Sequence, residues 1–203
     1  MGGLSARLAS RNENKLRELA RVLEGWELEL LAADGYPPED GSTYYENARG
    51  KARYGRRFTG GAWVIGEDSG IEVAGLGGGP GVRSARFARG EPVDRLLAEL
   101  AGVEGAGRRA RYVCELVALA PDGLELRGTG VLEGRIAEDP AGSEGFGYDP
   151  IFVPEGERQT VAELGDEWKA QNSHRARAAR DLLRALTDLV PGATGQKRNF
   201  GRE

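Results

Sequence analysis

The sequence is poor in cysteine, histidine and long hydrophobic segments. Its 203 residues include one cysteine and one histidine, which excludes an intramolecular disulfide and a cysteine-based zinc site. No apolar run approaches the roughly 20 residues that a membrane-spanning helix needs, and the N-terminus lacks the apolar region of a signal peptide. We therefore expect a cytoplasmic protein that does not associate with a membrane. We expect Cys114 to be a small core residue.

An excess of basic residues is also absent. The chain has 28 lysine and arginine residues against 32 aspartate and glutamate residues, which gives a formal net charge of -4. This balance does not favour a general electrostatic grip on nucleic acid, although a local basic pocket for a small phosphate compound is compatible with it. The length and the 39% apolar content suit one large domain or two closely joined lobes.

The order of predicted elements indicates an α/β fold. Apolar or alternating segments predict strands at 6–9, 27–31, 62–65 and 71–73, and a hairpin of 111–119 with 124–132. Helical spacing predicts helices at 16–23, 43–52, 93–100 and 178–189, with a capping box at Thr43 and Glu46 and an apolar stripe that includes Leu189. The hairpin argues against an all-parallel sheet.

Two adjacent carboxylates, Glu67 and Asp68, follow the apolar segment 62–65, where we expect a buried strand to meet solvent. Repulsion and desolvation make such a pair costly unless a cation or a hydrogen-bond network compensates it. A bound metal is one interpretation, and a polar strand-to-turn junction before Gly70 is the other.

The segment from Ser10 to Lys15 joins a predicted strand to a predicted helix. Free backbone N–H groups and the helix dipole favour an anion at a helix N-terminus, and Ser10, Asn12 and Lys15 add donors and a positive charge. A phosphate fits here, but the loop lacks the glycines of a P-loop, so an ordinary capped helix is the alternative.

Two further segments carry groups that suit a nucleotide base. Phe146 and Tyr148 stand among glycines, which is typical of a base-stacking platform or of a turn with its aromatic rings in the core. His174 and Arg175 at the start of the last predicted helix, with Lys169 just before it, supply donors that match a ring oxygen better than an exocyclic amine. Covalent catalysis has little support, because the single cysteine and the single histidine are far apart in sequence.

Six segments occur together in the order of the inosine triphosphate pyrophosphatase family, which the chain resembles from about residue 8 to residue 189. They are Ser10-x-Asn12-x-x-Lys15, Glu39 to Ala48, Asp68-Ser69-Gly70, Gly79 to Arg86, Gly145 to Pro150, and Lys169 with Ser173-His174-Arg175. The resemblance implies an elongated, two-lobed α/β fold around a long mixed sheet, with flanking helices and a central substrate cleft. It also implies a homodimer built from one domain at 1–190. From Pro191 onward the residues are polar, contain glycine and lack periodicity, so we expect a frayed, flexible tail at 191–203.

Members of this family hydrolyse deaminated purine nucleoside triphosphates (ITP, dITP, XTP) to the monophosphate and pyrophosphate with Mg²⁺, which removes them from the nucleotide pool. The resemblance makes Asp68 the general base and a metal ligand, and Glu39 a second metal ligand. It assigns substrate contacts to Ser10, Arg11, Asn12, Glu13, Asn14, Lys15, Ser69, Phe146, Gly147, Tyr148, Asp149, Lys169, His174 and Arg175.

The acid pairs depart from the family pattern. Pro38-Glu39 and Glu67-Asp68 stand where many relatives carry two acids and two aspartates, so the resemblance leaves open whether Glu67 reaches the metal. Two other functions stay open as well. One is a pyrophosphatase for pyrimidine or other modified nucleotides, and the other is a nucleotide-binding module without catalysis.

Overall fold

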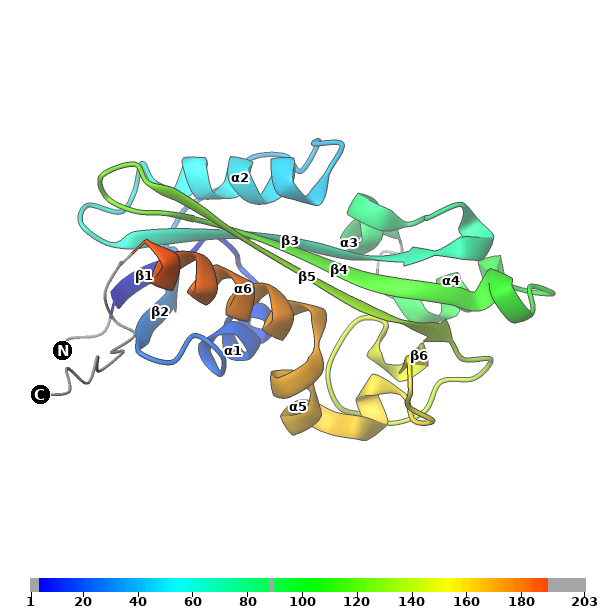
Figure 1. The fold of residues 1–203 in the computed structure, drawn as a ribbon. Coiled ribbons are helices and arrows are strands. Elements are labelled where there is room, and N and C mark those ends of the chain that lie inside the picture. The colour runs from blue at the N-terminus through cyan, green and yellow to red at the C-terminus, as the bar shows by residue number, and fades with distance from the viewer. Residues whose placement is uncertain (1–3, 88–89, 190–203) are drawn as a thin grey trace, which may run out of the picture.

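The structure, a computed structural model, describes residues 4–87 and 90–189. In this part of the chain one mixed sheet has the strand order β2-β1-β3-β4-β5-β6 (Figure 1). The strands are β1 (Leu4–Leu8), β2 (Trp26–Leu30), β3 (Trp63–Val73), β4 (Arg109–Leu119), β5 (Glu125–Ile136) and β6 (Phe152–Pro154). β1 is parallel to β2 and β3, whereas β3 to β6 are antiparallel neighbours. The predicted α/β class with a mixed sheet is confirmed.

Helices cover both faces of the sheet. α2 (Tyr44–Gly55) lies on one face, and α1 (Glu13–Ala20), α5 (Val161–Asn172) and α6 (His174–Asp188) lie on the other (Figure 1). Two further helices, α3 (Ser84–Phe87) and α4 (Pro92–Glu99), lie toward the C-terminal end of β3. No helix within 4–87 or 90–189 combines the length and the apolar character needed to cross a membrane.

The apolar interior consists of two main clusters. One surrounds Leu8, Ile65 and Leu182 between the sheet and α1 and α6, and it includes Cys114, which is buried as predicted. The other surrounds Ile71 and packs residues of α4 and β6 against the far half of the sheet. The prediction of two lobes stays a prediction.

Glycines allow two helices to touch the sheet directly. A Cβ atom on Gly66 of β3 would lie 1.9 Å from the carbonyl oxygen of Ala48 in α2, and one on Gly130 of β5 would lie 1.9 Å from that of His174 in α6. Any larger side chain at these positions must displace helix backbone. These contacts therefore fix the distance of α2 and α6 from the strands they cover.

The structure differs from the sequence prediction around the two carboxylates. β3 is one continuous strand, so the prediction of separate strands at 62–65 and 71–73 is wrong. Glu67 and Asp68 lie inside it, 0% and 4% exposed, and not at a junction with solvent. Cations and amides from other elements compensate them there, and these partners cannot be identified from the local sequence.

The C-terminal third shows two further differences. β6 and α5 were not predicted, although Thr160 and Glu163 form a capping box that signals the start of α5. The helical spacing predicts Leu189 as part of the apolar stripe of the last helix, but Leu189 follows the end of α6 and is 48% exposed. The predicted tail at 191–203 lies outside the described residues.

Candidate functional site

The loop between β1 and α1 is organised by its own side chains. Asn12 is the N-cap of α1, and its Oδ1 accepts hydrogen bonds from the backbone N–H groups of Asn14 at 2.9 Å and Lys15 at 3.2 Å. Ser10 Oγ accepts the backbone N–H of Asn12 at 3.1 Å. This loop lines a cavity of about 890 Å³, which we call the phosphate-loop cavity. The predicted strand-loop-helix junction is confirmed, and its helix N-terminus adjoins an open space.

β3 directs its polar side chains to both faces of the sheet, because successive residues of a strand alternate. Glu67 and Ser69 contact residues of α1 and α6, whereas Asp68 contacts residues of α2. Glu67 Oε2 accepts from Lys15 Nζ at 2.5 Å, and Oε1 accepts from Arg175 Nε at 3.1 Å. Burial opposes ionisation of Glu67, but Lys15 and Arg175 outweigh it and hold its pKa well below the ordinary range. Both carboxylate oxygens are therefore already engaged by cations.

Asp68 has a different environment on the opposite face. Its Oδ2 accepts from Asn47 Nδ2 at 2.9 Å, and its Oδ1 lies 3.4 Å from Lys51 Nζ. Burial raises the pKa of Asp68 above its ordinary value, although Lys51 and Asn47 act in the opposite direction. The result is a carboxylate that is more basic than one in water, which suits a proton acceptor.

Lys51 brings a second carboxylate to the same place. Its Nζ donates to the backbone carbonyl of Glu67 at 2.7 Å and forms an ion pair with Glu39. Two carboxylates, those of Glu39 and Asp68, thus converge on one ammonium group. Within the described residues no three His, Cys, Asp or Glu side chains form a metal-binding group. Mg²⁺ commonly takes only one or two carboxylates together with phosphate oxygens and water, so this all-oxygen pair fits it.

A second cavity of about 350 Å³, which we call the base-sized cavity, lies beside Phe146. The predicted base-binding segments line it. The Phe146 ring is half-buried, with Lys169 Nζ 4.6 Å and the Arg175 guanidinium 5.5 Å from its centroid. Tyr148 is buried, and its hydroxyl donates to the carbonyl of Ser84 at 3.0 Å. Phe146 is therefore available to the cavity, whereas Tyr148 is fixed in the wall.

Asp149 is a buried acceptor in this cavity. Its Oδ2 accepts from Lys169 Nζ at 2.8 Å and from the backbone N–H of Phe146 at 2.8 Å, and its Oδ1 accepts from the Tyr112 hydroxyl at 3.3 Å. Burial raises the pKa of Asp149, and Lys169 acts against that shift. A carboxylate and an ammonium group thus stand side by side in the wall of the cavity.

His174 opens α6 directly after the N-cap Ser173 and is buried. Its ring stacks on Tyr112 with centroids 4.5 Å apart and an interplanar angle of 10°. Nδ1 has no hydrogen-bond partner among the described residues. Burial lowers the pKa of His174 well below its ordinary value, and Arg175 acts in the same direction. His174 is therefore a neutral imidazole at neutral pH.

Glu18 of α1 connects the cationic side chains of the cavity. Its Oε1 accepts from Lys169 Nζ at 2.5 Å, and its other oxygen forms an ion pair with Arg175. Arg175 Nη2 also donates to Ser69 Oγ at 2.9 Å. Lys169 lies before the last helix, as the sequence predicts, and belongs to α5, whereas His174 and Arg175 begin α6.

Several residues that contact the predicted site residues have no predicted role. Those with polar contacts to them in the interior include Glu18, Asn47, Lys51 and Tyr112. Two signals in the sequence were available, because Glu18 follows Lys15 by three residues and Lys51 follows Asn47 by four. Each spacing places both side chains of the pair on one helix face.

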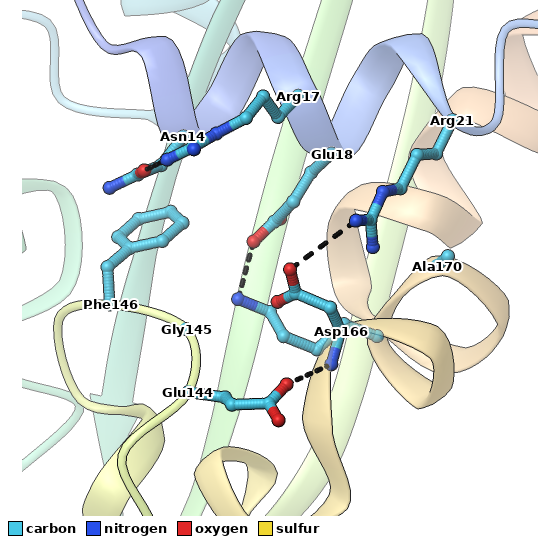
Figure 2. A pocket seen from close by; sticks show the side chains of 10 residues that line it. Asn14, Arg17, Glu18, Arg21, Glu144, Gly145, Phe146, Asp166 and Ala170 are labelled. Atoms are coloured by element: carbon cyan, nitrogen blue, oxygen red, sulfur yellow. Dashed lines mark hydrogen bonds and ion pairs between the residues drawn. The ribbon is translucent and has the colours of Figure 1, made fainter.

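A third cavity, of about 340 Å³, lies between α1 and α5 on the other side of Glu18 (Figure 2). Arg21 and Asp166 face each other across it at 3.5 Å, and Glu144 Oε2 accepts the backbone N–H of Asp166 at 3.0 Å. Phe146 and Lys169 line this cavity as well as the base-sized one. These two residues therefore form a shared wall.

The first two cavities adjoin, since Asn12, Lys15 and Ala85 line both of them. Every residue predicted to contact substrate lines at least one of the two. Asp68 lies one contact behind Lys51, which lines the larger cavity together with Glu39. The structure thus brings the predicted residues into one continuous region, while their individual roles stay predictions.

Fold and site together define an α/β protein in which a helix N-terminus beside paired carboxylates adjoins an aromatic cavity with charged walls. The sequence model of the Ham1 family matches residues 6–185. The chain belongs to the Ham1 family.

Similar proteins agree with this membership. A dITP/XTP pyrophosphatase of Gloeobacter violaceus is 47% identical over 182 residues, which are 87% of this chain and 91% of the relative. One of Bdellovibrio bacteriovorus is 40% identical over 195 residues, 91% of this chain and 98% of the relative. Among solved structures, a HAM1 protein from Coxiella burnetii superposes with a TM-score of 0.78 at 34% identity, covering 91% of this chain and 99% of that one.

Proposed function

We propose that the protein hydrolyses deaminated purine nucleoside triphosphates such as ITP, dITP and XTP to the nucleoside monophosphate and pyrophosphate. Curated relatives named dITP/XTP pyrophosphatase support this. The observation that carries the proposal is that the base-sized cavity and the phosphate-loop cavity join at Asn12 and Lys15. A ligand with a flat base at one end and a chain of phosphates at the other has the shape of this joined space.

The carboxylate and ammonium groups of Asp149 and Lys169 are complementary to the edge of a deaminated purine. Hypoxanthine and xanthine carry a ring N–H next to a carbonyl oxygen, so the carboxylate accepts from the first and the ammonium donates to the second. Adenine carries a ring nitrogen acceptor next to an amine, and both contacts are then mismatched. Guanine shares the favourable edge, so selection against GTP must act at purine position 2. The base stacks on Phe146.

Asp68 acts as the general base. In its ionised form it takes a proton from the attacking water, whose oxygen bonds to phosphorus as the α–β anhydride bond breaks and pyrophosphate leaves. Lys15, Ser69 and the N–H groups of the loop at 10–14 hold the triphosphate. Glu39 and Asp68 would hold Mg²⁺, which when bound neutralises phosphate charge and orients the triphosphate.

Three further proposals come from the sequence. The domain and the dimer rest on the resemblance to the family, whereas the location and the free substrate rest on composition and charge. The chain forms one domain at 1–190, and the single sheet that passes through both apolar clusters supports this. The protein is a homodimer. It works in the cytoplasm on a free nucleotide and not on nucleic acid.

A substrate panel tests the proposed function. The protein is incubated with ITP, dITP, XTP, ATP, GTP and dTTP in MgCl₂, and pyrophosphate and orthophosphate are measured separately. We expect pyrophosphate from ITP, dITP and XTP at a rate at least about tenfold above that from ATP, because adenine mismatches both contacts at the edge of the base. Equal rates on ATP, or orthophosphate as the first product, would contradict the proposal. A preference for dTTP would favour the pyrimidine alternative, and tight ITP binding without turnover would favour a binding module.

A further inference from the structure

The short helix α3 is in contact with both halves of the proposed site. Its residue Ala85 lines the phosphate-loop cavity and the base-sized cavity alike. Of these two cavities, Ser84 lines the base-sized one and Arg86 lines the phosphate-loop one. One turn of helix therefore contributes residues to both sides of the junction.

Arg86 holds the loop that carries Glu39. Its Nη2 donates to the backbone carbonyl of Glu39 at 2.7 Å, and its Nη1 lies 3.4 Å from Glu39 Oε2. The other carboxylate oxygen of Glu39 is paired with Lys51. The Glu39 carboxylate is thus held between a buried lysine of α2 and an arginine of α3. A planar guanidinium that binds a carbonyl and a carboxylate at once restricts the loop in a way that a single point charge does not.

Ser84, two residues before Arg86, ties α3 to the base side. Its Oγ accepts the backbone N–H of Ile71 in β3 at 2.9 Å and donates to the carbonyl of Gly81 at 2.6 Å. Its carbonyl oxygen accepts the hydroxyl of Tyr148, the wall residue next to Asp149, at 3.0 Å. Ser84 and Tyr148 are both buried, so these bonds are shielded from water.

We propose that Arg86 is a positioning residue, which sets the Glu39 carboxylate for the metal–triphosphate complex and links it through α3 and Ser84 to Tyr148 in the wall of the base cavity. This inference rests on the proposed function. Binding of the base then affects the reaction through the protein as well as through the bound nucleotide, since a base that shifts Tyr148 also shifts the helix that holds Glu39. Selection of the base then acts on kcat as well as on KM.

Binding measurements test the first half of the proposal without turnover. The probe is α,β-methylene-ITP, in which carbon replaces the bridging oxygen so that the α–β bond cannot be hydrolysed. Its Kd is measured by titration calorimetry in EDTA and in saturating MgCl₂. For Arg86→Ala we expect the Kd in EDTA to stay within about twofold of wild type, while the tightening by Mg²⁺ shrinks at least about fivefold, a coupling of ordinary size. Arg86→Lys restores only part of it, because lysine cannot hold both groups.

Arg83→Ala is the matched control, because Arg83 is an exposed arginine three residues earlier on the neighbouring 3-10 helix. It removes the same charge, and we expect wild-type binding with and without Mg²⁺. An Arg86→Ala protein that keeps the full Mg²⁺ effect would overturn the proposal. Equal weakening in EDTA and in MgCl₂ would also overturn it, since Arg86 would then bind phosphate directly.

A double-mutant cycle tests the link to the base. Tyr148→Phe removes only the hydroxyl that donates a hydrogen bond to the carbonyl oxygen of Ser84. We expect this change to lower kcat for ITP more than it raises KM. Combined with Arg86→Ala it should cost less than the product of the two separate effects, since both changes disturb one connection. Multiplicative effects would overturn the link. A wild-type protein that releases no pyrophosphate from ITP would refute the proposed function instead, and an unchanged Mg²⁺ effect in an active enzyme would refute this inference alone.

Discussion

Asp68 is a residue whose chemistry and stability oppose each other. Its folded-state pKa lies above the ordinary value because of burial, so protonation favours the folded protein. The stability from that term is present below the unfolded pKa and is lost as pH rises through the folded pKa. At neutral pH the ionised form therefore costs stability, as expected of a group retained for function.

Asp68→Asn separates the two properties. We expect turnover of ITP to fall by about 100-fold or more, the usual loss on removing a general base, while Tm at pH 7 stays equal or rises because a neutral amide replaces a costly charge. Pyrophosphate release and thermal unfolding followed by circular dichroism measure the two. Asp188→Asn, at the exposed end of α6, should leave turnover unchanged. A variant with normal turnover would remove Asp68 from the mechanism.

Glu67 supports the site by a different route. It is fully buried and paired with Lys15 and Arg175, and removing one member of such a group leaves cations without compensation. We expect Glu67→Gln to lower the free energy of unfolding by about 3–5 kcal/mol, measured by urea unfolding. The same change at Glu29, an exposed glutamate paired with Arg7 at 3.1 Å, should cost at most about 1 kcal/mol. Similar losses for both would show that Glu67 is not structurally coupled to its partners.

Phe146 offers a ring to the cavity and contributes little to the core. We expect Phe146→Ala to raise KM for ITP by a factor that corresponds to about 1–3 kcal/mol, the range for one lost base stack, with little change in Tm. Steady-state kinetics and thermal unfolding check the two. Phe58→Ala removes an exposed phenylalanine elsewhere and should leave KM as it is. A large fall in Tm with unchanged KM would identify Phe146 as a core residue.

At the scale of elements, docking by glycine gives a sharp contrast between two positions. Gly130→Ala puts a methyl group 1.9 Å from the carbonyl of His174, so α6 must shift, and His174 and Arg175 with it. We expect a loss of about 1–3 kcal/mol of stability or more and a lower kcat/KM for ITP. Gly50→Ala lies on the open side of α2, where the new Cβ meets nothing within 4 Å, and should stabilise by about 0.5–1 kcal/mol. Equal effects at the two positions would contradict the glycine contact.

Elements whose signals are local were predictable from the sequence. The Thr43 capping box is present, with Glu46 N–H donating to Thr43 Oγ1 at 3.1 Å and Thr43 N–H donating to Glu46 Oε2 at 3.2 Å. The hairpin of β4 and β5 also forms where its turn residues indicate. Both depend on residues close together in the chain.

The remainder of the site depends on contacts between distant residues. Glu67 is tolerated inside a strand because of an arginine 108 positions away, and Glu18 meets Arg175 across 157 positions. Local patterns carry no information on such pairs. The continuity of β3 and the connecting role of Glu18 therefore appear only once the chain is folded, whereas the segments that supply the cavity walls were identifiable in advance.

At the scale of the whole molecule, the chain has a single histidine. A histidine contribution to the pH dependence of stability can therefore be assigned to His174. The pKa of His174 in the folded state lies well below the ordinary 6.5, so the unfolded chain binds the proton first as pH falls. The stability contributed by neutral His174 is present above about pH 6.5 and is lost as pH falls toward the folded pKa. The limiting slope of this term is about 1.4 kcal/mol per pH unit.

His174→Phe keeps an aromatic ring beside Tyr112 and removes the titration. We expect the free energy of unfolding of the wild type to fall between pH 6.5 and 5, and that of His174→Phe to fall less over the same range because one proton-binding term is gone. Urea unfolding at several pH values measures both. Identical pH slopes for the two proteins would mean that His174 titrates normally in the folded state. Asp68 and Asp149, whose pKa values are raised, contribute with the opposite sign and are common to both proteins.

The alternation of side chains along β3 has a consequence for how this chain can change in length. Glu67 and Asp68 serve opposite faces of the sheet only because each occupies its own register position. Inserting one residue between Trp63 and Glu67 would turn the cation-paired carboxylate toward α2 and the basic carboxylate toward α6, exchanging two environments that favour opposite protonation states. Two inserted residues would restore the faces. The strand thus imposes a rule of parity, under which single-residue insertions or deletions in β3 are more damaging than most substitutions there.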